Sequence, residues 1–375
     1  MIRLGLSIAS LLLSLLNIFS APTYHTWLLA VTVSEFPLIF MGAAMVLILM
    51  SNVTTRFKTA GTAVSVLAFI LFASPVARAF LIADNLQTEL NQAFKDKEVS
   101  APAERPFSFW QLATRAEENA AYTTLRYQDA AATVSTLDFY SADSAGLRPC
   151  IIVVHGGSWS SGDSQQLPEL NTFLINRGYH VASLNYHKAP EWQSPKPLED
   201  VRKAILYLKS RAAQLSIDTS RLVILGRSAG AQIALMAAYS DADPGIKGAI
   251  SFYGPADMVW GYSMPASRWV MDSRKVMENY LGGPYSEIPQ KYKSASPIEY
   301  VTVDSPPTLI IHGRNDVLVA YEHSRRLAAK LENNRVPHYL LTLPWATHGF
   351  DYTLQGPGGQ LSTFTIAMFL RKILK

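Results

Sequence analysis

The sequence predicts an α/β domain with a mostly parallel sheet, preceded by a membrane anchor of about three helices. Two observations support this fold class. Residues 1–83 hold only five of the 62 charged residues in the 375-residue chain. From residue 120 onward, short β-rich apolar runs alternate with helical patterns, which is typical of a parallel sheet flanked by helices. We therefore divide the chain into an anchor (1–83), a linker with a short helix (84–119) and an α/β domain (120–375).

The anchor is predicted from three nearly uncharged stretches, at about 4–20, 27–50 and 59–83. Each is close to the roughly 20 apolar residues that a spanning helix needs. The first stretch could instead be a cleaved signal peptide, although its apolar run is long and its cleavage site is poor. Glu35 and Pro37 would fall inside the second helix, and the sequence assigns Glu35 no role.

Basic residues predict the orientation of this anchor. Arg3 precedes the first stretch, and Arg56 and Lys58 lie between the second and third. The positive-inside rule places all three in the cytoplasm. After three crossings, the α/β domain would lie on the outer side of the membrane.

Composition excludes several classes of protein. Of the formal net charge of +4, the anchor carries +3 and the remaining residues +1, without a basic cluster. The charge therefore gives no reason to expect nucleic-acid binding. The one cysteine, Cys150, excludes an intrachain disulfide framework and a cysteine-rich metal site.

Seven strands and four helices are expected in the α/β domain. The strands are expected at Val134–Tyr140, Cys150–His155, Val181–Tyr186, Leu222–Gly226, Ala249–Tyr253, Thr308–His312 and Tyr339–Leu343. The helices are expected at Leu198–Leu215, Ala229–Tyr239, Tyr321–Leu331 and Gln360–Leu374, the last of them amphipathic.

The strongest functional signal is the pentapeptide Gly226-Arg227-Ser228-Ala229-Gly230, which joins an expected strand to an expected helix. This is the G-x-S-x-G nucleophile elbow in the context that its mechanics require, because a tight turn exposes the serine hydroxyl above the sheet. We interpret Ser228 as the nucleophile. Its alternative role would be that of a serine that caps the helix.

A serine nucleophile needs a base and an acid that orients the base. Asp316 follows one expected strand and His348 follows the next, in the order Ser, Asp, His. Both would lie at the carboxyl edge of the sheet, where open α/β sheets place their sites. The sequence therefore predicts a Ser228–His348–Asp316 triad.

The residues His155-Gly156-Gly157-Ser158-Trp159 follow another strand. Glycines let backbone N–H groups approach the oxygen that becomes negative during acyl transfer. We expect an oxyanion hole made by Gly156, Gly157 and Ala229. Ser158, Trp159, His187 and Trp260 are candidates for the substrate pocket, and residues 255–300 are a candidate lid, because the connection between the strands is long.

These motifs resemble the α/β-hydrolase superfamily, in particular its branch of esterases similar to hormone-sensitive lipase, feruloyl and acetyl esterases and arylformamidases. The resemblance spans about 137–375. It rests on HGGSW (155–159), GRSAGA (226–231), HGRNDVLV (312–319) and THGF (347–350), together with LDFYSA (137–142), GYHVASLNYHKAPE (178–191) and PLEDVRKAILYLK (197–209). The chain has Ser158 and Trp159 where the lipase-like branch usually has a third glycine. The resemblance implies no metal and no organic cofactor.

We therefore expect a membrane-anchored serine carboxylesterase that acts on a small-molecule or lipid-like ester. Amidase, formamidase or peptidase chemistry on the same triad is the alternative. A catalytically inactive binding module is a third possibility, although it would normally lack a triad residue. Natural substrate and oligomeric state are left open by the sequence.

Overall fold

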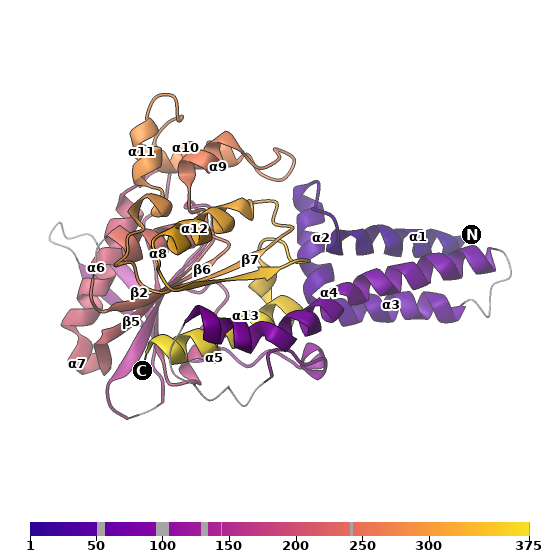
Figure 1. Ribbon diagram of the computed structural model, residues 1–375, viewed down its shortest axis with the longest axis horizontal. Helices are drawn as coiled ribbons and strands as arrows, with labels where there is room; N and C mark the ends of the chain where they lie inside the picture. The colour runs from indigo at the N-terminus through magenta and orange to yellow at the C-terminus, as the bar shows by residue number, and fades with distance from the viewer. Residues whose placement is uncertain (51–56, 95–104, 129–133, 144, 241–242, 375) are drawn as a thin grey trace.

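A central sheet organises the catalytic domain in the computed structural model, which describes residues 1–50, 57–94, 105–128, 134–143, 145–240 and 243–374 (Figure 1). The eight strands lie in the order β1-β2-β4-β3-β5-β6-β7-β8. Strand β2 pairs antiparallel with β1 and β4, and all other neighbours are parallel. The strands are β1 (Thr123–Gln128), β2 (Val134–Tyr140), β3 (Arg148–Val154), β4 (His180–Leu184), β5 (Ile217–Arg227), β6 (Ile246–Phe252), β7 (Thr308–Gly313) and β8 (His338–Leu343).

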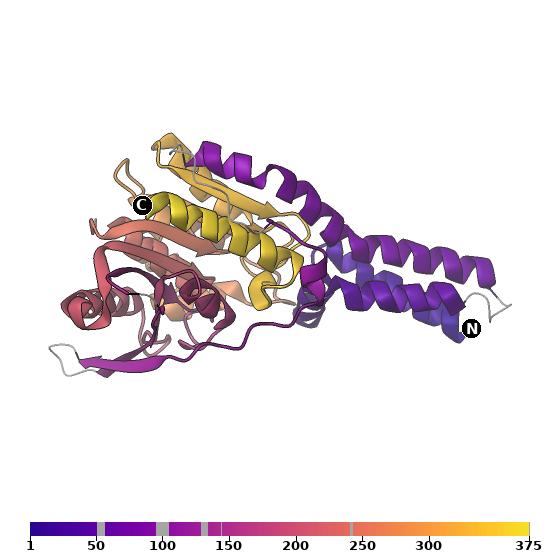
Figure 2. The ribbon, with the colours of Figure 1, turned by 90° about the horizontal axis from the view of Figure 1, so that it is seen from below.

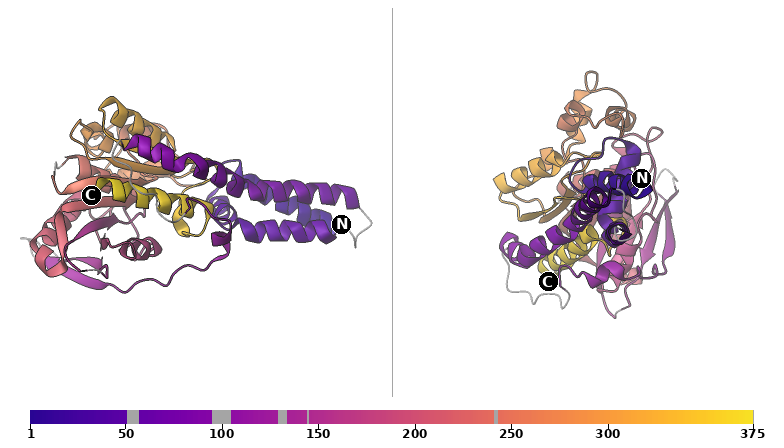
Figure 3. Two further views of the ribbon diagram at one scale, coloured as in Figure 1. Left: turned by 60° about the horizontal axis from the view of Figure 1, so that its bottom comes forward. Right: turned by 90° about the vertical axis from the view of Figure 1, so that its right-hand side faces the viewer.

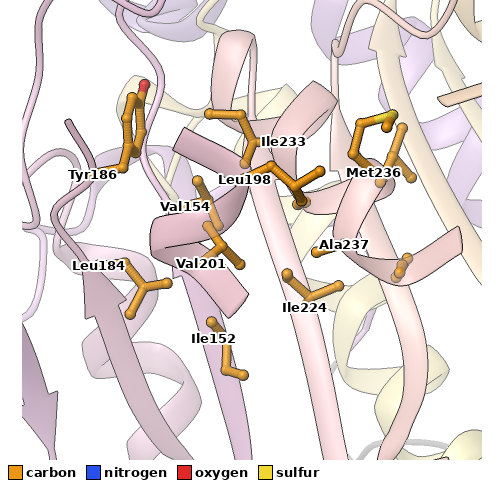
Figure 4. Packing of buried hydrophobic residues seen from close by; sticks show 14 of the residues in the cluster. Ile152, Val154, Leu184, Tyr186, Leu198, Val201, Ile224, Ile233, Met236 and Ala237 are labelled. Carbon is orange, nitrogen blue, oxygen red and sulfur yellow. The ribbon is translucent and has the colours of Figure 1, made fainter. Parts of the chain in front are cut away.

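Helices cover both faces of this sheet. One face packs against α6 (Lys196–Ser210), α8 (Ala229–Ser240) and α12 (Glu322–Asn333), and Figure 4 shows apolar side chains of that core, such as Ile152, Ile224 and Ile233. The opposite face packs against α5 (Glu169–Ile175) and α13 (Pro357–Ile373). The expected helix at 198–215 ends earlier, at Ser210, and a separate short helix α7 (Ala212–Leu215) follows it. The β6–β7 connection contains α9 (Met258–Ser263), α10 (Ser273–Leu281), α11 (Pro289–Ser294) and η4 (Pro297–Tyr300).

The N-terminal helices project from the domain as a bundle, which Figure 1 shows on the right. It contains α1 (Ile2–Ser14), which η1 (Leu15–Asn17) extends, α3 (Pro37–Leu49) and the start of α4 (Lys58–Ala93). Helix α2 (Tyr24–Glu35) lies across the end of this bundle, next to the catalytic domain. Within the described residues, α4 alone is long and apolar enough to cross a membrane, and the bent pair α2–α3 would add a second span if counted as one.

The second apolar stretch is not the single helix expected at 27–50. It forms α2 and α3, which meet at an angle of 87°. The chain breaks at Phe36, and Pro37 occupies the first turn of α3. A proline has no N–H to donate to the preceding turn, so it starts a helix more readily than it continues one. The break sets α2 apart from the bundle and brings it to the catalytic domain.

Helix α4 also departs from the expected boundary at residue 83. It continues without interruption to Ala93, so the short helix expected after residue 84 is the end of α4. This extension packs on α13, as Figures 2 and 3 show, and the rings of Phe94 and Phe369 lie 4.9 Å apart. As a result α13 is buried almost all round rather than amphipathic. The second half of α4 and the catalytic domain therefore share one hydrophobic core.

Candidate active site

The nucleophile elbow connects β5 to α8. Ser228 adopts the left-handed conformation, with φ +52°, and its N–H donates to the carbonyl of Phe252 on β6. A side chain at Gly226 would collide with the backbone of Gly230, and one at Gly230 would collide with the carbonyl of His155. These close approaches explain why the turn needs glycine on both sides of the serine.

The three residues expected to form a triad lie within hydrogen-bonding distance of one another. His348 Nε2 lies 2.9 Å from Ser228 Oγ, and His348 Nδ1 lies 2.7 Å from Asp316 Oδ2. The distances fit an imidazole that donates from Nδ1 and accepts from the serine hydroxyl at Nε2. The arrangement can remove the serine proton and later return a proton to a leaving group.

The side chain of Asp316 is buried, and other groups besides His348 donate hydrogen bonds to its carboxylate. Its Oδ1 accepts the N–H groups of Leu318 and Val319, both at 2.9 Å, and Oδ2 lies 3.1 Å from His312 Nε2. Burial alone would raise the pKa of this carboxyl. The charge of His348 and the hydrogen bonds from His312 and His348 outweigh burial and hold the pKa of Asp316 well below its ordinary value. His312 is thus a neighbour of the acid that we did not predict from the sequence.

The glycine loop that follows β3 approaches Ser228, but the backbone N–H groups free to bind an oxyanion are not all of those expected. The Gly156 N–H donates to Gln166 Oε1 at 2.7 Å, so it already has a partner. Among the described residues, no acceptor takes the N–H of Gly157 or Ala229. Gly157 has a φ of +113°, and a side chain there would collide with the carbonyl of Ser161. Gly157 and Ala229 are therefore better placed to receive an oxyanion, while Gln166 fixes the loop through Gly156.

Two cavities meet at Ser228. The smaller one, of about 220 Å³, lies under α9 and α10, and its mainly apolar lining includes Met264, Met271, Val276 and Met277. The larger one, of about 740 Å³, is open and includes His348 and Gly157 in its lining. Ser158 lines both cavities. The expected lid region thus supplies much of the wall of the smaller cavity.

Helix α2 forms one wall of the larger cavity, which we call the α2 groove. Its lining residues from α2 and the adjoining break are Tyr24, Trp27, Leu28, Val31, Thr32 and Phe36. The Trp27 indole N–H also donates to the carbonyl of His348 at 2.9 Å. Sequence reasoning missed these residues because their apolar pattern fits a membrane helix equally well.

Two pocket candidates lie elsewhere. His187 Nδ1 is 2.8 Å from Asp200 Oδ2, and His187 lines neither cavity at Ser228. Trp260 lines a separate surface hollow and packs against His323. Trp159 does line the smaller cavity, but it is buried, stacked on Tyr280 and hydrogen-bonded to Gln232. Its hydrogen bond and stacking make it a fixed wall rather than an adaptable contact.

Arg227, the variable residue of the elbow, points into the protein interior. It is 2% exposed, and its Nε lies 2.5 Å from Asp351 Oδ2. The hydroxyl of Tyr253 donates to the other oxygen of Asp351, and the Tyr253 ring lies 4.3 Å from that of His348. The buried Arg227–Asp351 pair therefore fixes Tyr253, and the Tyr253 ring packs against His348. Within the described ranges, no three His, Cys, Asp or Glu side chains are grouped so that they could hold a metal ion.

Several known proteins are similar to this chain in sequence. Two curated relatives come from Mycobacterium tuberculosis (strain ATCC 25618 / H37Rv). The probable carboxylic ester hydrolase LipM is 27% identical over 56% of this chain and 51% of LipM, and the esterase LipQ is 31% identical over 54% of this chain and 50% of LipQ. The chain thus matches about half of the length of each relative.

Solved structures show the same fold. A bacterial heroin esterase superposes with a TM-score of 0.60 and 21% identity, covering 80% of this chain and 93% of that chain. The BD-FAE family model matches residues 137–331, more than half of the chain, and this segment includes the glycine loop, the elbow and Asp316. With its mostly parallel sheet, its elbow and this match, the chain belongs to the BD-FAE family of α/β-hydrolases.

Proposed function

We propose that the protein is a carboxylic ester hydrolase that works through an acyl-serine intermediate. The observation that carries the proposal is the continuous hydrogen-bonded row from Ser228 through His348 to Asp316, which lies where two cavities meet. The names of LipM and LipQ, which are an ester hydrolase and an esterase, favour ester over amide substrates.

In the first half of the reaction, Ser228 Oγ attacks the ester carbonyl carbon while His348 Nε2 takes the hydroxyl proton. The carbonyl oxygen becomes negative, and the N–H groups of Gly157 and Ala229 stabilise it. The bond from the carbonyl carbon to the alcohol oxygen then breaks. His348 gives its proton to that oxygen, which leaves an acyl-serine and a free alcohol.

In the second half, a water molecule replaces the alcohol. His348 removes one proton from the water, the resulting hydroxide attacks the acyl carbon, and the serine oxygen leaves with the proton from His348. Asp316 holds the imidazole in one tautomer throughout and stabilises its positive charge. Its low pKa keeps it ionised at neutral pH, as this role requires.

The proposal includes membrane anchoring, with the catalytic domain on the outer side. Arg3 and Lys58 lie together at the end of the bundle that is far from the catalytic domain, and Arg3 NH1 is 3.4 Å from the carbonyl of Lys58. By the positive-inside rule, the end of a membrane helix bundle that carries basic residues faces the cytoplasm. Helix α4 would then be the spanning segment, with the shorter apolar helices α1 and α3 beside it.

The test uses the full chain in detergent micelles with p-nitrophenyl acetate. We expect hydrolysis by the wild type, labelling of Ser228 by a fluorophosphonate, and a loss of turnover of at least about 10⁴-fold in Ser228→Ala. Ser240→Ala, which changes a serine at the far end of α8, is the matched control. Absence of both hydrolysis and labelling in the wild type would contradict the proposal, and a preference for the matching p-nitroanilide would favour amidase chemistry instead.

A further inference from the structure

One face of helix α2 borders the α2 groove. The α2 residues in its lining follow one another at spacings of three, one, three and one from Tyr24 to Thr32. With 3.6 residues per turn, these positions lie on one face of the helix. Ala30 and Val33, outside the stripe, are buried elsewhere. Helix α2 thus turns a whole face toward the catalytic serine, and most of that face is apolar or aromatic.

The position of α2 matches the outer boundary of a membrane. Arg78 follows Lys58 by 20 residues of α4, which corresponds to about 30 Å, the thickness of the hydrocarbon core. Arg78 NH1 lies 3.5 Å from the carbonyl of Asn17, where η1 ends just before α2. Helix α2 therefore begins at the level of Arg78, and it runs across the bundle rather than along it (Figure 1).

Exposed aromatic residues gather at the same level. Trp269 is 80% exposed, and its carbonyl accepts the N–H of Tyr24 at the start of α2. Trp110 is equally exposed and lies in η3 (Trp110–Ala113), close to Phe107, whose ring is 4.8 Å from that of Phe80 on α4. Tryptophan and tyrosine are enriched where proteins meet the membrane–water interface. The entrance to the α2 groove thus lies beside a surface suited to lipid headgroups.

Reaction geometry decides which part of an ester lies in each cavity. The alcohol oxygen must receive its proton from His348, and His348 lines the α2 groove but not the smaller cavity. The acyl carbon stays bonded to Ser228, and its substituent points away from the leaving oxygen. The smaller cavity, bordered by α9 and α10, is therefore the place for the acyl group, and its volume of about 220 Å³ favours a short one.

The geometry points to a substrate that resides in the membrane, an ester with a short acyl group in the smaller cavity and a long apolar alcohol in the α2 groove. This assignment rests on the proposed ester hydrolysis and adds the substrate class to it. The alcohol chain passes from the bilayer along α2 to Ser228 without crossing water. After cleavage, the alcohol returns to the bilayer and the short acid leaves through water.

Two isomeric esters test the assignment directly. Hexadecyl acetate and ethyl palmitate have the same formula and differ in the side of the ester oxygen on which the long chain lies. We would reconstitute the full chain into phosphatidylethanolamine–phosphatidylglycerol vesicles that contain one or the other ester. We expect kcat/KM to be at least about tenfold higher for hexadecyl acetate, because a cavity of about 220 Å³ has too little room for a long acyl chain.

A pair of neighbouring substitutions on α2 tests the groove. Leu28 and Leu29 are exposed to almost the same extent, at 44% and 43%, but only Leu28 lines the groove. We expect Leu28→Trp to lower the ratio of hexadecyl acetate to p-nitrophenyl acetate turnover by at least about fivefold, in line with partial blocking of an apolar site. We expect Leu29→Trp to leave this ratio unchanged. Val31→Trp, deeper in the groove, should lower the ratio further.

The outcomes separate this inference from the proposed function. If p-nitrophenyl acetate is hydrolysed but ethyl palmitate is preferred to hexadecyl acetate, the assignment of the two cavities is wrong and the esterase stands. If Leu28→Trp and Leu29→Trp leave the ratio equally unchanged, the α2 groove does not bind the chain. If no ester is hydrolysed at all, the proposed function itself fails.

Discussion

At the scale of single residues, two histidines converge on Asp316. His348 reaches Oδ2 at 2.7 Å and His312 reaches the same oxygen at 3.1 Å. His312 Nδ1 lies 2.6 Å from Ser324 Oγ, so both ring nitrogens of His312 have hydrogen-bond partners. The acid is therefore held from several sides, so its orientation toward His348 does not depend on one bond. Orientation of the base is the main contribution of the acid in such a triad.

His323, next to this group, makes the fold sensitive to acid. It is buried between Asp257 and Trp260, and burial lowers its pKa to about 3, with a smaller effect from the charge of His312. In the unfolded chain the group titrates near its ordinary 6.5. Between pH 6.5 and 3 the unfolded state therefore binds more protons than the folded state, and the free energy of unfolding falls as the pH falls. Arg326 and Asp316 also act on this histidine, in opposite directions.

We predict that His323→Gln makes the free energy of unfolding depend less steeply on pH below pH 6.5. The wild type should lose of the order of 3 kcal/mol from this residue between pH 7 and pH 4, in addition to the losses from other groups. The glutamine cannot be protonated there, although it costs some stability at neutral pH. Denaturant unfolding at a series of pH values measures the difference. Curves that run parallel for the two proteins would show that His323 does not titrate as the structure implies.

At the scale of elements, Glu35 joins α2 to the catalytic domain. Its Oε2 accepts the N–H of Gly358 at 2.8 Å, in the first turn of α13, and Trp345 Nε1 lies 3.4 Å from Oε1. Burial raises the pKa of the Glu35 carboxyl to about 8, so at neutral pH its oxygen acts mainly as a hydrogen-bond acceptor for the helix N-terminus, where N–H groups lack partners within the helix. A side chain at Gly356 would collide with this carboxyl. Glu35, to which sequence reasoning assigned no role, is thus one of the polar contacts that hold α2 in place.

We expect Glu35→Ala to lower the free energy of unfolding by about 1 to 3 kcal/mol, because it leaves the buried Gly358 N–H without an acceptor. Glu35→Gln keeps an oxygen in position and should cost less. Thermal unfolding of the full chain in micelles compares the two variants. Equal losses in both would mean that the hydrogen bond to Gly358 is not what holds α2.

The sequence predicted seven strands of the catalytic domain because each is an apolar run between turn residues, and a buried parallel strand needs such a run. It missed β1 because Thr123–Gln128 lies at the edge and buries only Tyr127. The candidate triad residues could be proposed from the sequence because each follows its strand at the carboxyl edge of the sheet. The α2 groove could not be predicted, since it depends on a bend at Phe36 and on the docking of α2, which local sequence patterns do not encode.

At the scale of the whole molecule, the second half of α4 is a structural part of the catalytic domain. Leu86 and Leu90 of α4, and Phe94 directly after it, are buried against the C-terminal helix and the sheet. Complete burial of three such side chains contributes about 5 to 9 kcal/mol, which is comparable to the stability of an ordinary domain. The catalytic domain therefore includes the second half of α4.

We predict that a fragment beginning at residue 105 aggregates or unfolds, whereas one beginning at residue 76 keeps a folded sheet. Both lack α1 to α3, and they differ in the second half of α4. Circular dichroism, size-exclusion chromatography and p-nitrophenyl acetate turnover would compare them. Equal yield and equal melting temperature for the two fragments would refute the shared core.

The pairing of α4 with α13 also sets an order of events in biogenesis. More than 260 residues separate the end of α4 from the start of α13. During synthesis, α4 is made long before its partner exists, and the apolar face of its second half stays uncovered until then. Contacts between such distant segments form late and slowly. A protease or chaperone would therefore meet an α4 with one face uncovered in every nascent chain, and folding of the enzyme is complete only when α13 has been made.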